Sequence, residues 1–201
     1  MKIKNFYKKF KTKNKCYNER AFTLIELMVV IAISVLIGGA LFVNLRAGGR
    51  SMDLNSSAEK LAGVIKQAQM MALSGKQIDS IRPAGGYGVY FDVSTDPDSY
   101  KIFANTNDAD NYEYDAGDME IQTITLPEQV SMIPSDLTPL NPVKSIIFKP
   151  PYGPIYVSSG SGGTPLTGTN RAQVLLQHLE ANFYAYVRIN SQGEIDVRKT
   201  D

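Results

Sequence analysis

Cysteine, histidine and tryptophan are nearly absent from this sequence. Its 201 residues include one cysteine, Cys16, one histidine, His178, and no tryptophan. A single cysteine cannot form a disulfide within the chain, so the fold must be stabilised by a hydrophobic core. A hydrophobic content of 43% is enough for one modest core and one membrane segment.

The sequence also lacks the residue patterns that support catalysis. It contains no recognisable Ser/His/Asp constellation, no glycine-rich phosphate loop and no pair of acids spaced to form a cleft. His178 lies in a strand-like segment with no second histidine, which is more typical of a structural residue than of a catalytic one. We therefore expect a protein without enzymatic activity and without a cofactor.

Positive charge is concentrated in the N-terminal segment. Residues 1–21 contain eight lysines and arginines and one glutamate, a net charge of +7. The remaining residues contain 13 basic and 19 acidic side chains, a net charge of −6. Because a basic segment in front of an apolar run stays on the cytoplasmic side of a membrane, we expect a cytoplasmic N-terminus and an exported remainder.

An uncharged apolar run follows, from Leu27 to Leu45. Its 19 residues correspond to roughly 28 Å of helix, close to the hydrocarbon thickness of a bilayer, about 30 Å. The apolar stretch of a secretory signal peptide is shorter, about 7–15 residues, and precedes a small-residue cleavage site that is not recognisable here. The run therefore predicts a retained transmembrane helix.

One acid, Glu26, directly precedes the apolar run. An interfacial glutamate that reaches the lipid headgroups is one explanation. The other explanation depends on its neighbours: the basic segment, the small residue Ala21, and then "FTLIE" from Phe22 to Glu26. Together these features resemble the class III signal of type IV prepilins and type II secretion pseudopilins.

That resemblance implies how the N-terminus is processed and used. A membrane prepilin peptidase would remove residues 1–21 by cutting between Ala21 and Phe22, and Phe22 would become the N-methylated amino terminus. Glu26 would then pair with the amine of a neighbouring subunit during filament assembly. The family usually has glycine before the cut, so Ala21 departs from the pattern.

A second helical segment is predicted over residues 51–76, after the transmembrane half at 22–45. The Gly48–Gly49 pair predicts a loosened junction between the two halves, and Gly75 suits the end of the second. An apolar stripe with the spacing of one helical face predicts that this half packs on its own domain. The stripe consists of Leu54, Leu61, Ile65, Ala68 and Ala72.

Short β segments separated by turn residues fill the chain over 85–201. This order indicates antiparallel strands rather than β–α–β units. The segment Asn190–Glu194 predicts a tight hairpin, and the Gly/Ser/Thr-rich segment Ser158–Asn170 predicts an exposed, mobile loop. The predicted fold class is α+β, with a long N-terminal helix packed on an antiparallel, β-sandwich-like head.

The order of these segments resembles the GspH/FimT group of minor pseudopilins and minor pilins. The similarity lies in "SAEKLAGVIKQAQMMALSGK", "GYGVYFD", "YKIFANTND" and the closing "VRINSQGEIDV". It implies a single-pass inner-membrane subunit, with its head outside, of a type IV pilus-like or type II secretion filament. Its partners would be the prepilin peptidase, other pilin or pseudopilin subunits, the inner-membrane assembly platform and membrane lipid.

The acid-rich segment over 105–118 raises a calcium hypothesis. Asp108, Asp110 and Asp115 are its candidate ligands, since oxygen-rich loops hold hard cations. Their spacing fails the EF-hand pattern, and a solvated acidic turn is the favoured interpretation.

DNA binding is the alternative function. Some FimT-type minor pilins capture DNA through a basic C-terminal motif of the Gly-Arg-x-Arg kind. Arg198 and Lys199 lie at the corresponding end, but the motif is missing. The negative charge of the chain after residue 21 also disfavours phosphate contact.

Overall fold

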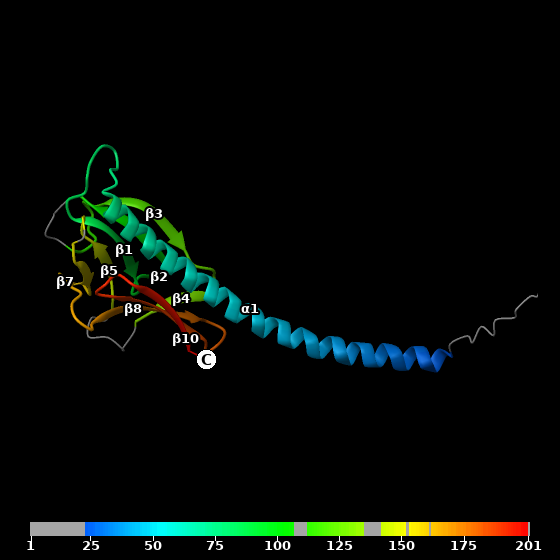
Figure 1. The fold of residues 1–201 in the computed structure, drawn as a ribbon. Helices are drawn as coiled ribbons and strands as arrows, with labels where there is room; N and C mark the ends of the chain where they lie inside the picture. The colour runs from blue at the N-terminus through cyan, green and yellow to red at the C-terminus, as the bar shows by residue number, and fades with distance from the viewer. Residues whose placement is uncertain (1–22, 107–111, 135–141, 152, 161, 201) are drawn as a thin grey trace, which may run out of the picture. The chain divides into compact units, whose positions relative to one another are not determined.

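A computed structural model describes residues 23–106, 112–134, 142–151, 153–160 and 162–200. Within these residues, one long helix precedes ten strands (Figure 1). The elements are α1 (Leu24–Ser74), β1 (Gly86–Asp92), β2 (Asp96–Asn105), β3 (Met119–Thr125), β4 (Val130–Ile133), β5 (Ser145–Phe148), β6 (Ile155–Ser158), β7 (Gly163–Pro165), β8 (Arg171–His178), β9 (Tyr184–Asn190) and β10 (Ile195–Thr200). The chain divides into two compact units, Met1–Asn44 and Leu45–Asp201.

Helix α1 has no interruption at Gly48 and Gly49. The structure therefore has one continuous helix where two segments joined by a loosened junction were expected. Glycine lowers helix propensity by about 1 kcal/mol, but unlike proline it still donates its backbone N–H to the helix. Two glycines without a proline are thus insufficient to end a helix that continues on both sides.

The end of α1 is formed by Gly75, as predicted. Gly75 has a φ of 58° and donates its N–H to the carbonyl of Ala72 at 3.1 Å. Lys76 donates to the carbonyl of Met71, also at 3.1 Å. This pair of bonds is a Schellman motif, which satisfies helix carbonyls that would otherwise have no partner.

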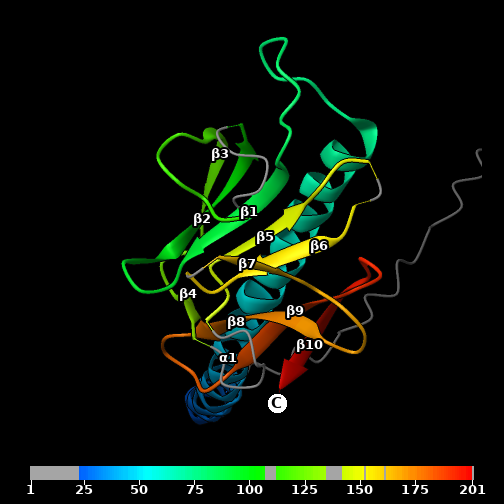
Figure 2. The same cartoon turned by 90° about the vertical axis from the view of Figure 1, so that its left-hand side faces the viewer.

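The predicted stripe of the second half of α1 is buried. Its members are at most 3% exposed: Leu54, Leu61, Ile65, Ala68 and Ala72. They belong to one hydrophobic core with residues of both sheets, such as Val89 and Val187. In Figures 1 and 2 the part of α1 that belongs to the second unit lies across both sheets. The stripe therefore joins the sheets into one domain.

The strands form a six-stranded sheet, in the order β3-β2-β1-β5-β6-β7, and a four-stranded sheet, in the order β10-β9-β8-β4 (Figure 2). Their pairings are antiparallel. In β9, buried Ala185, Val187 and Ile189 alternate with half-buried polar and aromatic residues, because successive side chains of a strand point to opposite faces. The α+β fold class is confirmed.

Strand β7 lies in the segment that was expected to be a mobile loop. Strand β7 pairs with β6, with Thr164 opposite Val157, and Leu166 just after it is only 3% exposed. The loop prediction for Ser158–Asn170 is therefore wrong over this part.

The hairpin over Asn190–Glu194 is confirmed. Gly193 donates its N–H to the carbonyl of Asn190 at 3.0 Å and has a φ of 80°. Such a positive φ is readily adopted by glycine. This hairpin sets the pairing of β9 with β10.

Candidate functional site

The first turn of α1 is capped by a reciprocal pair, Thr23 and Glu26. Glu26 Oε2 accepts hydrogen bonds from the backbone N–H of Thr23 at 2.9 Å and from its hydroxyl at 3.0 Å. The hydroxyl oxygen of Thr23 accepts from the backbone N–H of Glu26 at 3.3 Å. This is a capping box, in which a threonine at the N-cap and a glutamate three residues later satisfy each other's free donors.

The carboxylate of Glu26 is exposed and has room for another partner. Its second oxygen, Oε1, has no hydrogen bond with any residue that the structure describes. The helix dipole favours a negative charge at this end of α1. The carboxylate is therefore held in place by its own chain while one oxygen remains free to accept a hydrogen bond from outside.

Glu26 was predicted from the sequence to be a functional residue, whereas Thr23 was not. The signal was present, because threonine followed three residues later by glutamate, just before an apolar run, is the pattern of a capping box. Ala21 and Phe22, the predicted cleavage and methylation positions, lie outside the described residues.

The apolar part of α1 has the length and composition of a membrane span. The window Leu24–Leu41 contains 18 residues, and none of it is buried inside the structure. Leu24 is 77% exposed and Leu36 is 74% exposed. Ser34, a polar residue in this stretch, donates its hydroxyl to the carbonyl of Val30 at 2.8 Å, so that its polar group is satisfied within the helix.

The described acids of the 105–118 segment bond to nearby donors of the chain. Asp118 accepts from the backbone N–H of Thr106 at 3.3 Å and from that of Asp115 at 3.1 Å, while Asp115 accepts from Gly117 at 2.8 Å. These bonds connect Thr106, just after β2, with the residues that directly precede β3.

Glu113 fastens the same segment to the six-stranded sheet. Its Oε1 accepts from the backbone N–H of Gly162 at 2.6 Å and from the hydroxyl of Ser158. The residues that the structure describes contain no group of three His, Cys, Asp or Glu side chains placed to hold a metal ion. Asp108 and Asp110 lie outside the described residues, so the calcium site over Asp108, Asp110 and Asp115 stays a prediction.

His178 is fully buried on the inner face of β8. Its Nδ1 accepts from the backbone N–H of Glu180 at 3.2 Å, and its Nε2 has no hydrogen-bond partner among the described residues. This environment holds the side chain in the core at the turn between β8 and β9.

Arg198 and Lys199, the basic residues near the C-terminal end of the chain, do not share one face of the sheet. Arg198 and Lys199 are neighbours in β10, so their side chains point to opposite faces of the sheet. Arg198 is paired with Asp196, with Nε 2.6 Å from Oδ2. Arg198 and Lys199 therefore do not form a continuous basic track along this strand.

Comparison with known proteins identifies the N-terminal segment. Residues 16–42 match the family model of the prokaryotic N-terminal methylation motif, which is characteristic of type IV prepilin-like proteins, the pilins and pseudopilins. No curated protein and no solved structure matches the chain. The motif and the apolar helix are together consistent with a single-pass, inner-membrane-anchored pilin.

Proposed function

The chain carries the methylation motif of type IV prepilin-like proteins, and we propose that it is a minor pilin or pseudopilin of the GspH/FimT type. It is a structural, non-enzymatic subunit of a type IV pilus-like or type II secretion filament. Prepilin peptidase cuts it between Ala21 and Phe22, and Phe22 is then methylated. The observation that carries the proposal is the exposed, capped carboxylate of Glu26 at the start of an unburied apolar helix.

The unburied helix supports a subunit that is stored in a membrane and later assembled. A helix that is apolar on all sides and has no face packed on its own chain must be covered by lipid or by other helices. A bilayer provides the first environment, and a bundle of identical or similar helices in a filament provides the second. The same segment can therefore move between them without changing its fold.

The free oxygen of Glu26 supports a specific contact in that bundle. Cleavage before Phe22 creates a cationic amine one residue from the capping box. A neighbouring subunit can place its own amine against Oε1 of Glu26 while Oε2 remains bonded to Thr23. Because a charge buried without a partner is strongly unfavourable, this pairing favours one register between adjacent subunits.

The charge distribution supports the orientation. The segment 1–21 has a net charge of +7 and stays in the cytoplasm, where the peptidase cuts it. The head formed by the second unit is then exported, and without a disulfide it depends on its hydrophobic core.

Mass spectrometry after co-expression tests the proposal. We expect co-expression with a prepilin peptidase to shorten the chain by residues 1–21 and to leave methylated Phe22 at its start. The matched control is the same chain expressed with a catalytically inactive peptidase, which should yield the full-length mass. A chain that stays full-length with the active enzyme, or that is cut after Leu45, would refute the proposal.

A further inference from the structure

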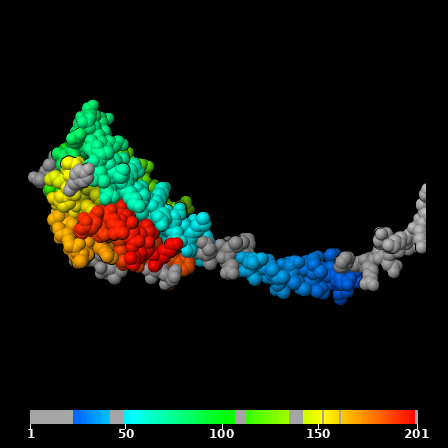
Figure 3. Space-filling view, in the orientation of Figure 1, coloured from blue at the N-terminus to red at the C-terminus, as the bar shows by residue number. Residues whose placement is uncertain are grey.

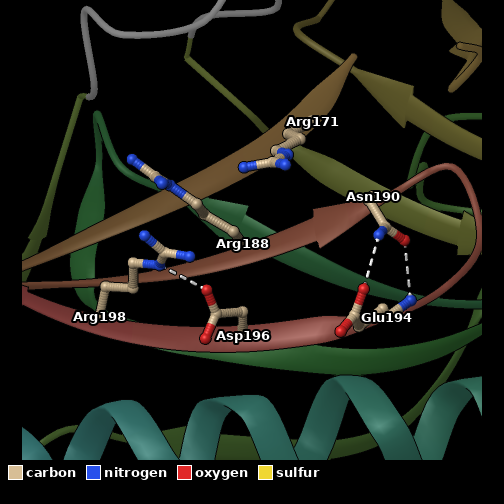
Figure 4. A pocket seen from close by; sticks show the side chains of 6 residues that line it. All are labelled: Arg171, Arg188, Asn190, Glu194, Asp196 and Arg198. Carbon is tan, nitrogen blue, oxygen red and sulfur yellow. Dashed lines mark hydrogen bonds and ion pairs between the residues drawn. The ribbon is translucent and has the colours of Figure 1, made fainter. Parts of the chain in front are cut away.

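A cavity of about 220 Å³ opens on the four-stranded sheet (Figure 4). Its six lining residues come from the three neighbouring strands β8, β9 and β10 and from the turn between the last two: Arg171, Arg188, Asn190, Glu194, Asp196 and Arg198. Their side chains lie on the side of the sheet away from α1. Figure 3 shows that the C-terminal part of the chain, in red, lies on the molecular surface.

Strand register brings the arginines together. Arg171 is opposite Asn190, and Arg188 is opposite both Gln173 of β8 and Asp196 of β10. Residues opposite each other in antiparallel strands point to the same face and lie close together. The cluster is therefore a consequence of sheet pairing between residues far apart in the sequence.

Three of the charged side chains that line the cavity already have partners within it. Arg198 is bonded to Asp196 at 2.6 Å. The carboxylate of Glu194 accepts from the side-chain amide of Asn190 at 3.0 Å, while the oxygen of that amide accepts from the backbone N–H of Glu194 at 2.9 Å. These bonds, dashed in Figure 4, hold the acidic side chains that line the cavity.

Arg171 and Arg188 keep free donors. Arg188 uses Nε to donate to Oε1 of Gln173 at 2.8 Å, and its guanidinium lies 4.4 Å from the centre of the Tyr186 ring. Its two terminal nitrogens have no hydrogen bond with a described residue, and the guanidinium of Arg171 forms no hydrogen bond or ion pair with any residue that the structure describes. A held guanidinium with free terminal nitrogens is suited to bidentate recognition of an oxyanion.

The surroundings favour one compact anionic group over a polyanion. Glu194 and Asp196 border the cavity, and the chain after residue 21 has a net charge of −6. A nucleic acid would bring many phosphates against these acids, whereas one carboxylate needs only the short-range donors of Arg171 and Arg188.

We propose that this pocket binds a carboxylate presented by the aspartate-rich β1–β2 turn of a second copy of this chain in the filament. The identity of the partner rests on the proposed function, but the site itself does not. The chain carries a turn of this chemistry at the β1–β2 hairpin, where Asp96 and Asp98 are exposed. The carboxylate of Asp98 makes no hydrogen bond or ion pair with a described residue.

The positions of the two surfaces fit a filament. The arginine pocket is on the four-stranded sheet, and the Asp92–Asp98 turn belongs to the six-stranded sheet. A contact between two different surfaces of like subunits is head-to-tail, so it leaves a free pocket and a free turn at the ends of every pair. Such a contact can therefore be repeated along a helical assembly.

Nuclear magnetic resonance titration of the full chain in detergent micelles tests the pocket. The probe is a peptide with the sequence of residues 92–98, "DVSTDPD", and its control is the same peptide with asparagine in place of each aspartate. We expect saturable shifts of the Arg171 and Arg188 side-chain signals with the aspartate peptide only. The signal of Arg82, an exposed arginine outside the pocket, should stay unchanged.

Arginine variants and an oligonucleotide ligand test the pocket further. Arg171→Gln and Arg188→Gln should each weaken peptide binding about tenfold, the usual effect of losing a hydrogen bond to a charged group, whereas Arg82→Gln should bind normally. Equal shifts with both peptides, or normal binding by the pocket variants, would overturn the site. Tighter binding of a single-stranded oligonucleotide of about 12 nucleotides through the same arginines would overturn the carboxylate assignment. The titration needs neither peptidase nor filament, so its failure is distinguishable from failure of Phe22 processing.

Discussion

Thr23 and Glu26 hold each other through three hydrogen bonds at the start of α1. The carboxylate of Glu26 accepts two of them, at 2.9 and 3.0 Å, and the hydroxyl of Thr23 accepts the third at 3.3 Å. Glu26 therefore has two possible roles, as a helix cap and as a charged partner for another subunit. A defect in a Glu26 variant has to be assigned to one of them.

Glu26→Gln and Thr23→Val separate the two roles. Glutamine still serves in a capping box but carries no charge, so we expect normal membrane insertion and cleavage with reduced incorporation into filaments. Thr23→Val removes the capping hydroxyl, at a cost of about 1 kcal/mol of helix stability, and keeps the acid, so incorporation should stay close to that of the native chain. The measurement is the cleaved fraction and the filament fraction from the same cells.

The opposite order of filament incorporation between the two variants would show that Glu26 acts as a helix cap. If Thr23→Val assembled poorly and Glu26→Gln assembled normally, the charge pairing would be wrong. Glu26→Ala, which loses both roles, gives the lower limit of the assay.

Ala21→Gly tests the departure from the family pattern at the cleavage position. Since the resembling prepilins usually carry glycine there, we expect the variant to be cut faster than the native chain by the same peptidase. A pulse-chase measurement of the processed fraction checks this. Glu26→Gln serves as a control, because it leaves both the leader and the scissile bond unchanged. Slower cutting of Ala21→Gly would show that alanine is the preferred residue for this enzyme.

Local patterns in the sequence were sufficient for much of the fold. The buried stripe that includes Leu61 follows from helical periodicity, the end of α1 from Gly75, and the last hairpin from its turn residues. Each of these depends on residues within a few positions of one another. The capping box at Thr23 was equally local and was overlooked.

Features that depend on distant partners could not be predicted. Strand β7 is only three residues long and exists because β6 lies beside it. Glu113 is held by Ser158 and Gly162, which are more than forty positions away. The arginine pocket likewise forms only because β8, β9 and β10 pair in their observed register, and no motif in the sequence predicts it.

Leu61→Ala tests the packing of α1 on the sheets. Leu61 is fully buried, and truncation of a buried leucine to alanine costs about 2–5 kcal/mol. Met70, on the same helix, is 63% exposed, so Met70→Ala should change the free energy of unfolding by less than about 0.5 kcal/mol. Urea denaturation of the full chain in detergent, followed by circular dichroism, provides the comparison. Similar effects of the two variants would contradict the observed burial.

Tyr100 and Tyr87 are both buried tyrosines, but their hydroxyls are in different environments. The hydroxyl of Tyr87 donates to the backbone carbonyl of Lys76, whereas that of Tyr100 has no hydrogen-bond partner among the described residues. Removal of a hydroxyl that has no partner costs little, while loss of a buried hydrogen bond costs about 1 kcal/mol. At neutral pH we therefore expect Tyr100→Phe to be as stable as the native chain or more so, and Tyr87→Phe to be less stable.

At alkaline pH the native chain should lose stability relative to Tyr100→Phe. Burial raises the pKa of Tyr100 from 10.0 to about 12, so the unfolded chain releases this proton before the folded chain does. Stability from this group is complete below about pH 10 and is lost as the pH rises toward 12, because the unfolded state then binds fewer protons. At about pH 11 the native chain should have lost about 1.4 kcal/mol relative to Tyr100→Phe, compared with about pH 8. Urea midpoints of both chains at the two pH values measure this difference. The comparison cancels the titration of lysines and other tyrosines, which both chains share, so an unchanged difference would mean that the Tyr100 hydroxyl is accessible to solvent in the folded protein.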